Sequence, residues 1–387
     1  MMIKTISNLL PFLFTLSFWR KPKASKNLIV MPASAKDLFD NGILSSKETF
    51  VLDLVKYKWL NLFIVINGLM KRRELLFENN YLFIVLSYID VLNSKYVVTW
   101  MDYQINFYWL KSYIKNPIYI SLQTGRRSGE PGYFFDLLQR GNYRNLSCDY
   151  IFCQGQAHAK EYSKYIKCQA IPSGYVRNNM TPVGSKDLQK KEVLFVSQYR
   201  TKKNNDNIVY GLDQKSNFFT WDFFYQSEKN LLPLLVEYCN KKSLKLNIVS
   251  AIASTEVEEK NFYDNLIGND NYNFIKHQNQ TSGYKAVDSF KYVVGCQSTL
   301  LYESLVRKNR TIFFDARGVD FGPFGWPLEL ALKGPFWTNE ITENELKRLM
   351  DFLINGSDAQ WLTKTDQIVK KLISFDNDNN LLRKALN

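Results

Sequence analysis

The chain has 387 residues, of which 45% are hydrophobic and 22% charged. This composition is typical of a globular protein and excludes an intrinsically disordered one, while the length suits two domains with separate cores. The net charge of +13 favours anionic partners such as phosphorylated donors or acidic lipid headgroups. Its basic residues are scattered and lack the spacing of DNA-reading helices or zinc fingers, so we expect no nucleic-acid partner.

The cysteines and histidines argue against metal chemistry. The five cysteines form no CxxC pair and leave an odd one over, and there are only two histidines. Neither a zinc site nor a disulfide framework is indicated, and a reducing cytoplasm suits this pattern. No paired aspartates stand in a metal-site context. We therefore expect no metal and no cofactor, with carboxylates carrying any catalysis.

Residues 1–26 form an apolar and basic leader. The segment Leu9–Trp19 is shorter than the ~20 residues that span a bilayer. Arg20, Lys21, Lys23 and Lys26 follow it. Two interpretations stay open: a segment lying in a membrane interface, which would make the protein peripheral on the inner face of the cytoplasmic membrane, or a first helix packed on the body.

Residues 27–175 show the alternation of strand and helix that predicts a parallel sheet in a Rossmann-like domain. A helix is expected over 103–114. The predicted strands are Asn27–Ala33, Phe50–Leu54, Leu62–Ile66, Lys95–Trp100, Ile118–Gln123 and Tyr150–Cys153.

A polar, Pro- and Gly-containing stretch over 171–191 predicts an exposed connection between domains. The alternation then restarts over 190–345, which we interpret as a second Rossmann-like domain with a long helix over 228–242. Residues 346–387 look helical, and such a terminal segment can cross back to the first domain. The strands predicted in the second domain are Glu192–Val196, Leu244–Ser250, Asn273–Ile275, Tyr292–Val294 and Thr311–Phe314.

The strongest local pattern runs from Tyr292 to Leu305: a strand, a small polar turn, and a helix that begins with Ser298 and Thr299. Backbone N–H groups at a helix N-terminus attract phosphate through the helix dipole. Glu303, four residues after Thr299, shares its helix face and could accept ribose hydroxyl groups. The alternative is that these hydroxyls only cap the helix.

Further polar side chains follow other strands of the second domain, and at the carboxyl edge of a parallel sheet they would face the same crevice. Ser197, Gln198 and Arg200 are candidates for nucleotide or phosphate contact, or a structural turn. Ser250–Ser254 could touch the base. His277 could contribute, whereas His158 is expected on the surface of a helix. A glycine-rich loop over 317–325 follows the last of these strands.

Several of these segments resemble bacterial surface-carbohydrate biosynthesis proteins that are glycosyltransferases of GT-B type, with a cleft between two Rossmann-like domains. The resemblance covers about residues 90 to 365. It rests on Tyr292–Phe314, Gly334–Thr338 and Trp361, together with Thr99–Asp102, Ile120–Arg126 and Val196–Arg200.

The resemblance is nearest to transferases of pseudaminic acid or related nonulosonates and more distant to Kdo transferases, which implies a CMP-activated keto-acid sugar as donor and a glycan or lipid-linked glycan as acceptor. The Kdo enzymes suggest a retaining reaction with a carboxylate nucleophile. Asp102 is the candidate here, with a helix N-cap as the alternative. Arg126 would bind the sugar carboxylate or an acceptor anion, and Glu130 would act as acid or base.

The sequence therefore predicts a metal-independent glycosyltransferase of capsule or O-antigen synthesis. Two alternatives stay open. One is transfer of a polyol phosphate from a CDP-alcohol to a wall polymer, and the other is a non-catalytic scaffold that binds glycan or nucleotide.

Overall fold

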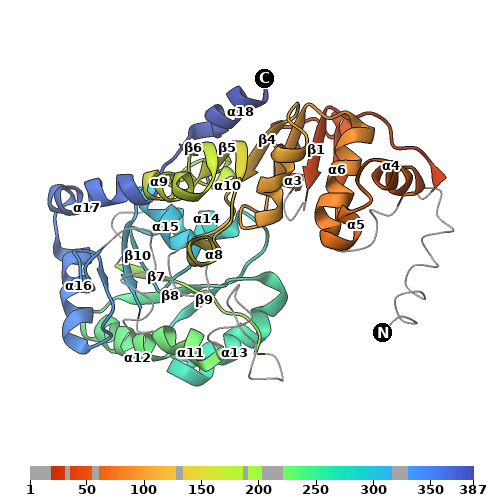
Figure 1. The fold of residues 1–387 in the computed structure, drawn as a ribbon. Coiled ribbons are helices and arrows are strands. Elements are labelled where there is room, and N and C mark those ends of the chain that lie inside the picture. The colour runs from red at the N-terminus through yellow and green to blue at the C-terminus, as the bar shows by residue number, and fades with distance from the viewer. Residues whose placement is uncertain are drawn as a thin grey trace.

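The computed structural model describes residues 19–30, 35–54, 61–127, 134–185, 191–202, 221–315 and 330–387. Two α/β domains stand against each other, each built on a parallel sheet flanked by helices (Figure 1). The predicted fold class, two Rossmann-like domains in a GT-B-like arrangement, is confirmed.

The first sheet has six strands in the order β2-β1-β3-β4-β5-β6, all parallel. Every residue of β1 and β3 is buried, as expected for a parallel sheet covered on both faces. The strands are β1 (Asn27–Val30), β2 (Thr49–Leu52), β3 (Tyr96–Thr99), β4 (Ile118–Leu122), β5 (Ser147–Cys153) and β6 (Lys167–Pro172).

The helices of the first domain correct two predictions. Residues 62–66 were expected as a strand but begin α4, because the Asn61 side chain caps the N–H groups of Phe63 and Ile64. The helix expected over 103–114 is a 3-10 turn, Ile105–Trp109, followed by the short α7. The helices are α3 (Ala35–Asp40), α4 (Leu62–Arg72), α5 (Leu75–Glu78), α6 (Asn80–Leu92), α7 (Leu110–Tyr113), α8 (Phe134–Arg140), α9 (Gln156–Tyr165) and α10 (Val176–Met180).

The second sheet is also six-stranded and parallel, in the order β12-β11-β10-β7-β8-β9. The strands β6 and β12 were not predicted, because β6 runs into the polar connection and β12 has only two residues. The strands are β7 (Glu192–Val196), β8 (Lys245–Val249), β9 (Asn273–Ile275), β10 (Tyr292–Gly295), β11 (Arg310–Phe314) and β12 (Trp337–Thr338).

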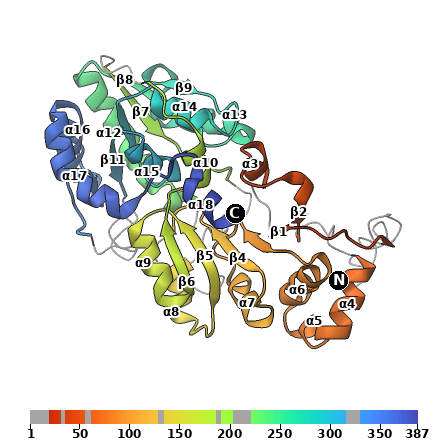
Figure 2. The same cartoon turned by 90° about the horizontal axis from the view of Figure 1, so that it is seen from above.

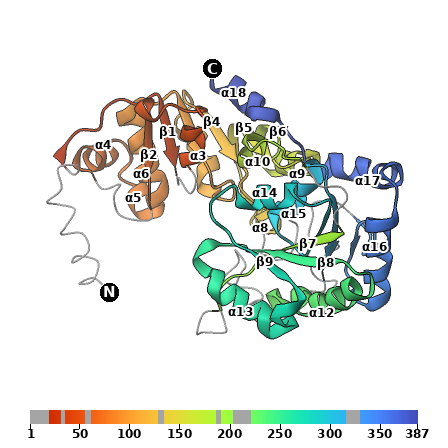
Figure 3. The same ribbon diagram turned by 180° about the vertical axis from the view of Figure 1, so that it is seen from behind.

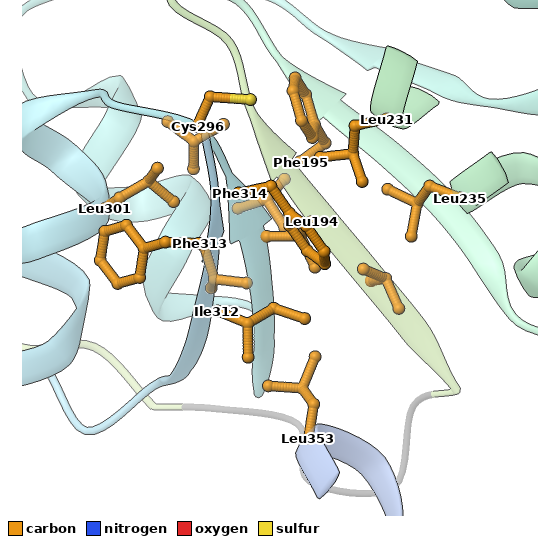
Figure 4. Close-up of a cluster of buried hydrophobic side chains, with 14 of the residues drawn as sticks. Leu194, Phe195, Leu231, Leu235, Cys296, Leu301, Ile312, Phe313, Phe314 and Leu353 are labelled. Carbon is orange, nitrogen blue, oxygen red and sulfur yellow. The ribbon is translucent and has the colours of Figure 1, made fainter. Parts of the chain in front are cut away.

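Helices pack on this sheet through aliphatic and aromatic side chains. Leu231 of α12 lies beside Phe195 of β7, and Leu353 of α16 lies close to Ile312 of β11 (Figure 4). The helices are α11 (Trp221–Phe224), α12 (Gln226–Lys241), α13 (Glu256–Ile267), α14 (Ser282–Asp288), α15 (Thr299–Val306), α16 (Glu343–Asn355), α17 (Asp358–Leu372) and α18 (Asn380–Leu386).

The end of the chain crosses from the second domain back to the first (Figures 2 and 3). Leu382 and Leu386 of α18 belong to the same buried cluster as Ile29 and Ile120 of the first sheet. The guanidinium of Arg383 donates to the carbonyl oxygens of Gly42 and Asn41 at 3.0 and 2.8 Å. The two domains are therefore tied together at a second place besides their direct connection.

The direct connection is anchored from the second domain by Arg307, whose side chain is fully buried. Its guanidinium pairs with Asp288 and donates to the carbonyl oxygens of Thr181 and Pro182 at 3.0 and 2.8 Å. These bonds hold the chain that leaves α10 against the second domain.

Within the described part of the chain, we find no helix that combines the length and the apolar character required to traverse a bilayer.

Candidate functional site

A pocket of about 450 Å³ opens at the carboxyl ends of β7, β8 and β10. This is the edge at which open parallel sheets bind ligands. All six residues predicted to bind the donor line it. Its lining consists of Arg177, Val196, Ser197, Gln198, Arg200, Phe224, Ser250, Ala251, His277, Gln280, Gly283, Tyr284, Gln297, Ser298, Thr299, Leu300 and Glu303.

The N-terminus of α15 lies at this pocket. Ser298 occupies the N-cap position with extended backbone angles, but its side chain makes no capping hydrogen bond. The structure therefore does not support the alternative in which the Ser298 hydroxyl serves only as a cap. The first N–H groups of α15 and the hydroxyls of Ser298 and Thr299 together form a positively polarised surface suited to phosphate.

Glu303 lies one turn into α15 and lines the pocket, although its side chain is only 5% exposed. The Tyr284 hydroxyl donates to its Oε1 atom at 2.8 Å. Burial raises the pKa of Glu303 to about 7, against the opposing effects of the Tyr284 hydrogen bond and of Arg177 and Arg307. Near neutral pH this carboxyl can therefore accept a hydrogen bond from a ligand hydroxyl or, when protonated, donate one.

The turn after β7 is held by a buried network. The Ser197 hydroxyl accepts a hydrogen bond from the Tyr199 N–H at 3.0 Å, and its oxygen lies 2.6 Å from the hydroxyl oxygen of Tyr263. Glu228 accepts from Tyr263 at 2.8 Å and from the Gln198 N–H at 3.3 Å, and burial raises its pKa to about 8. Because its hydroxyl is used inside the turn, Ser197 shapes the pocket wall, whereas Arg200 is exposed at the rim.

The turn after β8 is built in the same way. Ser250 donates to the Glu259 carboxylate at 2.7 Å, and the Ala251 N–H donates to it at 3.0 Å. Ser250, Ala251 and His277 line the pocket, but Ser254 is not among its lining residues. The predicted contribution of Ser250–Ser254 therefore narrows to the first two residues of that segment.

Asp102 follows the carboxyl end of β3, where it was predicted. It is fully buried, and Arg127 forms a two-point ion pair with it, with Nε and Nη2 each 2.6 Å from a carboxylate oxygen. The Tyr162 hydroxyl donates at 2.6 Å and the Thr124 N–H at 3.3 Å. Both oxygens of the Asp102 carboxylate are thus engaged within the first domain, and its role as nucleophile stays a prediction. Asp102 is not a helix N-cap, since Gln104 holds that position.

Asp102 organises the loop that follows β4, and this loop meets the second domain. The Nη2 atom of Arg126 lies 3.2 Å from Oε1 of Gln297, next to Ser298. Gln297 in turn donates to Asp315 at the end of β11. Arg126 is thus the predicted first-domain residue that contacts the pocket lining, through Gln297, although it is not itself a lining residue. Glu130 and the glycine-rich segment 317–325 lie outside the described residues.

His158 was expected at the surface but is buried in α9. Its Nε2 atom lies 2.9 Å from the carbonyl oxygen of Arg127. Burial lowers the pKa of His158 to about 3, so the ring is neutral at physiological pH. The residue supports the same loop as Asp102.

Sequence reasoning missed Arg177, Tyr284 and Gln297. Arg177 lies on α10, inside the segment interpreted as an exposed connection, and donates to Asp37 of α3 at 2.7 Å while it lines the pocket. No spacing in the sequence identifies it, because its position depends on how the connection folds between the domains. Gln297 directly precedes Ser298 and could have been included as its neighbour. Tyr284 lies on α14, apart from the predicted residues in the sequence, and only folding brings it to Glu303.

In the parts of the chain that the structure describes, no cluster of three or more His, Cys, Asp or Glu side chains could hold a metal ion.

Two Rossmann-like domains, each built on a parallel sheet, with a polar pocket at the carboxyl edge of the second sheet, define an α/β protein of GT-B-like fold. Residues 120–387 match the protein family described as "putative O-antigen biosynthesis protein". The chain belongs to this family.

Solved structures share the fold at low sequence identity. The Listeria monocytogenes protein described as a "putative UDP-N-acetylglucosamine 2-epimerase" has a TM-score of 0.51 at 9% identity, covering 93% of this chain and 94% of that one. Anabaena Alr3699/HepE in complex with UDP and glucose has a TM-score of 0.48 at 12% identity, covering 94% and 99%. The wall teichoic acid polymerase TagF has 0.48 at 11% identity, covering 100% and 97%. No curated protein matches the chain.

Proposed function

We propose that this protein is a glycosyltransferase that moves a sugar from a nucleotide-activated donor to a glycan or lipid-linked glycan acceptor, at the cytoplasmic face of the membrane. The observation that carries the proposal is the pocket at the N-terminus of α15, where Ser298, Thr299 and Glu303 lie together. The helix N-terminus suits the donor phosphate, and Glu303 suits a ribose hydroxyl. Membership of an O-antigen biosynthesis family supports a surface glycan as the product.

For the donor we propose a CMP-activated nonulosonate or a related keto-acid sugar, following the resemblance of the sequence motifs. Such a sugar carries a carboxylate, and Arg126 extends from the first domain towards the pocket that would hold it. A guanidinium forms forked, charge-assisted hydrogen bonds with a carboxylate. The acceptor would then approach from the first domain, and domain closure would exclude water from the activated sugar.

Thermal unfolding of the purified protein with CMP, CDP, UDP and GDP tests the donor class. A ligand at a hundred times its Kd stabilises the folded state by about 2.7 kcal/mol. We expect the largest rise in unfolding midpoint with CMP. A larger rise with CDP would favour transfer of a polyol phosphate. Detection of phosphate in the product linkage would then establish that reaction. Binding of CMP-sugar without any turnover would identify a scaffold, and a response only to UDP or GDP would overturn the donor assignment.

Replacing the two hydroxyls at the start of α15 tests where the nucleotide binds. We expect the Ser298→Ala, Thr299→Ala double variant to bind nucleotide at least about 10-fold more weakly by calorimetry, since hydrogen bonds to charged groups contribute about 1.5–3 kcal/mol each. Ser289→Ala is the matched control, because Ser289 is exposed at the end of α14 and bonds only within its helix. Unchanged affinity in the double variant would remove the phosphate site from α15.

Arg126 tests the contribution of the first domain. We expect Arg126→Ala to weaken binding of a CMP-activated keto-acid sugar by about 10-fold or more, because a charge-assisted hydrogen bond to the sugar carboxylate is lost. Binding of CMP itself should change little, so the ratio of the two affinities is the informative quantity. Arg144→Ala, at an exposed arginine of the same domain, is the control. Equal losses for CMP and the sugar nucleotide would contradict this role.

A further inference from the structure

One face of α4 and α5 exposes large apolar side chains to solvent. Phe63, Ile66, Met70 and Phe77 are 40%, 45%, 81% and 90% exposed. Within α4, spacings of three and four residues place Phe63, Ile66 and Met70 on one side of the helix, and Phe77 lies on the short α5 that follows. We call these four residues the α4–α5 face.

The opposite side of the same segment packs on α6. Ile64, Gly68 and Leu75 are buried there, and Gly68 lies so close to Phe83 that a β-carbon would collide with its ring. Packing within the domain is thus complete without the α4–α5 face. Folding of the domain accounts for only one apolar side of a helix that is apolar on both sides. Exposed apolar side chains grouped together indicate an interaction site.

Cations lie near the face. Arg73 is exposed between Met70 and Phe77. The Lys71 side chain is 52% exposed, although it pairs with Asp90 of α6 at 3.3 Å. The segment 19–23 adds exposed Arg20, Lys21 and Lys23 together with Trp19, and it is tied to the start of α4 because Asn61 donates to the Arg20 carbonyl oxygen at 2.9 Å. The nearby acidic residues, Glu74, Glu78 and Asp90, are fewer than these cations.

The face also lies apart from the pocket. In all three views α4 and α5 occupy the outer end of the first domain, away from the second domain (Figures 1, 2 and 3). The pocket at the start of α15 lies elsewhere on the molecule, and none of the four residues of the face lines it.

We propose that the α4–α5 face docks the protein on an anionic lipid bilayer. Apolar side chains would enter the boundary between headgroups and acyl chains, and the flanking cations would lie against the acidic headgroups. A second copy of this chain is a poorer occupant, because a symmetric contact would bring the same cations together. The inference does not rest on the proposed function. If the protein bound vesicles but no nucleotide, membrane docking would stand and the proposed glycosyltransferase function would fall.

Flotation of the full chain with phosphatidylcholine vesicles, with and without phosphatidylglycerol, tests the proposal. We expect the unmodified protein to float with the anionic vesicles only, and Met70→Glu, Phe77→Glu to reduce the bound fraction about tenfold or more, since each substitution puts a carboxylate where apolar burial is needed. Val257→Glu, Leu362→Glu is the control, because these residues are 73% and 58% exposed elsewhere on the molecule.

Both double variants change exposed side chains, so their unfolding midpoints should match that of the unmodified protein, which separates lost docking from lost folding. Three results would overturn the proposal. The first is equal flotation of the α4–α5 variant and the unmodified protein, which would assign binding to another segment such as the leader. The second is no flotation of the unmodified protein. The third is a dimer, seen by sedimentation velocity without lipid, that the α4–α5 variant abolishes.

Discussion

Asp102→Ala should lower the free energy of unfolding by roughly 3–5 kcal/mol, the effect of removing one partner of a buried ion pair. The Arg127 side chain is only 12% exposed, so its charge would be left in the interior without its carboxylate. The hydroxyl of Tyr162 and the N–H of Thr124 would lose an acceptor as well. Urea unfolding followed by circular dichroism measures the loss.

Two variants show whether burial is the cause. Tyr162→Phe removes one hydrogen bond but keeps the ion pair, and should cost about 1 kcal/mol. Asp366→Ala breaks the exposed pair with Lys370 and should cost well under about 1 kcal/mol. A loss for Asp102→Ala no larger than for Asp366→Ala would contradict the buried role. A stable Asp102→Asn protein that binds donor but transfers no sugar would support Asp102 as the catalytic nucleophile.

Glu303 should make stability depend on pH in the neutral range. Its folded-state pKa of about 7 lies above the ordinary value of 4.5, so the folded protein holds this proton more tightly than the unfolded chain does. The resulting stabilisation is complete below about pH 4.5 and is lost as the pH rises through about 7. The difference between the two values corresponds to about 3 kcal/mol.

Glu303→Gln removes this titration while it keeps the size and polarity of the side chain. We therefore expect the difference in unfolding free energy between the unmodified protein and Glu303→Gln to shift by about 3 kcal/mol, in favour of the variant, from acidic to alkaline pH. The comparison has to be a difference, because Glu228, whose pKa burial raises to about 8, imposes a slope of the same sign on both proteins. A difference that stays constant with pH would mean that folding does not raise the pKa of Glu303.

Local patterns were sufficient for most of the fold. Strands such as β1, β3 and β7 are short runs of apolar residues, because each strand of a covered parallel sheet buries both faces. Polar residues in the sequence mark where such runs end. The same reasoning located the pocket, since the residues that follow parallel strands share one edge of the sheet. It did not identify the start of α4, because a short apolar run is compatible with either a strand or a helix. There the N-cap at Asn61 determines that the segment is helical.

What the tertiary structure alone decided is the environment of each side chain. Sequence reasoning identified Asp102, Ser197 and Ser298 as polar residues at strand ends. In the structure the Asp102 carboxylate and the Ser197 hydroxyl are engaged within their own domains, whereas the Ser298 side chain makes no capping hydrogen bond. Asp102 meets Tyr162, 60 residues away, and Arg177 meets Asp37, 140 residues away. Backbone hydrogen bonding and side-chain periodicity depend on neighbours along the chain. Burial, ion pairing and the availability of a polar group for a ligand depend on residues that only folding brings together.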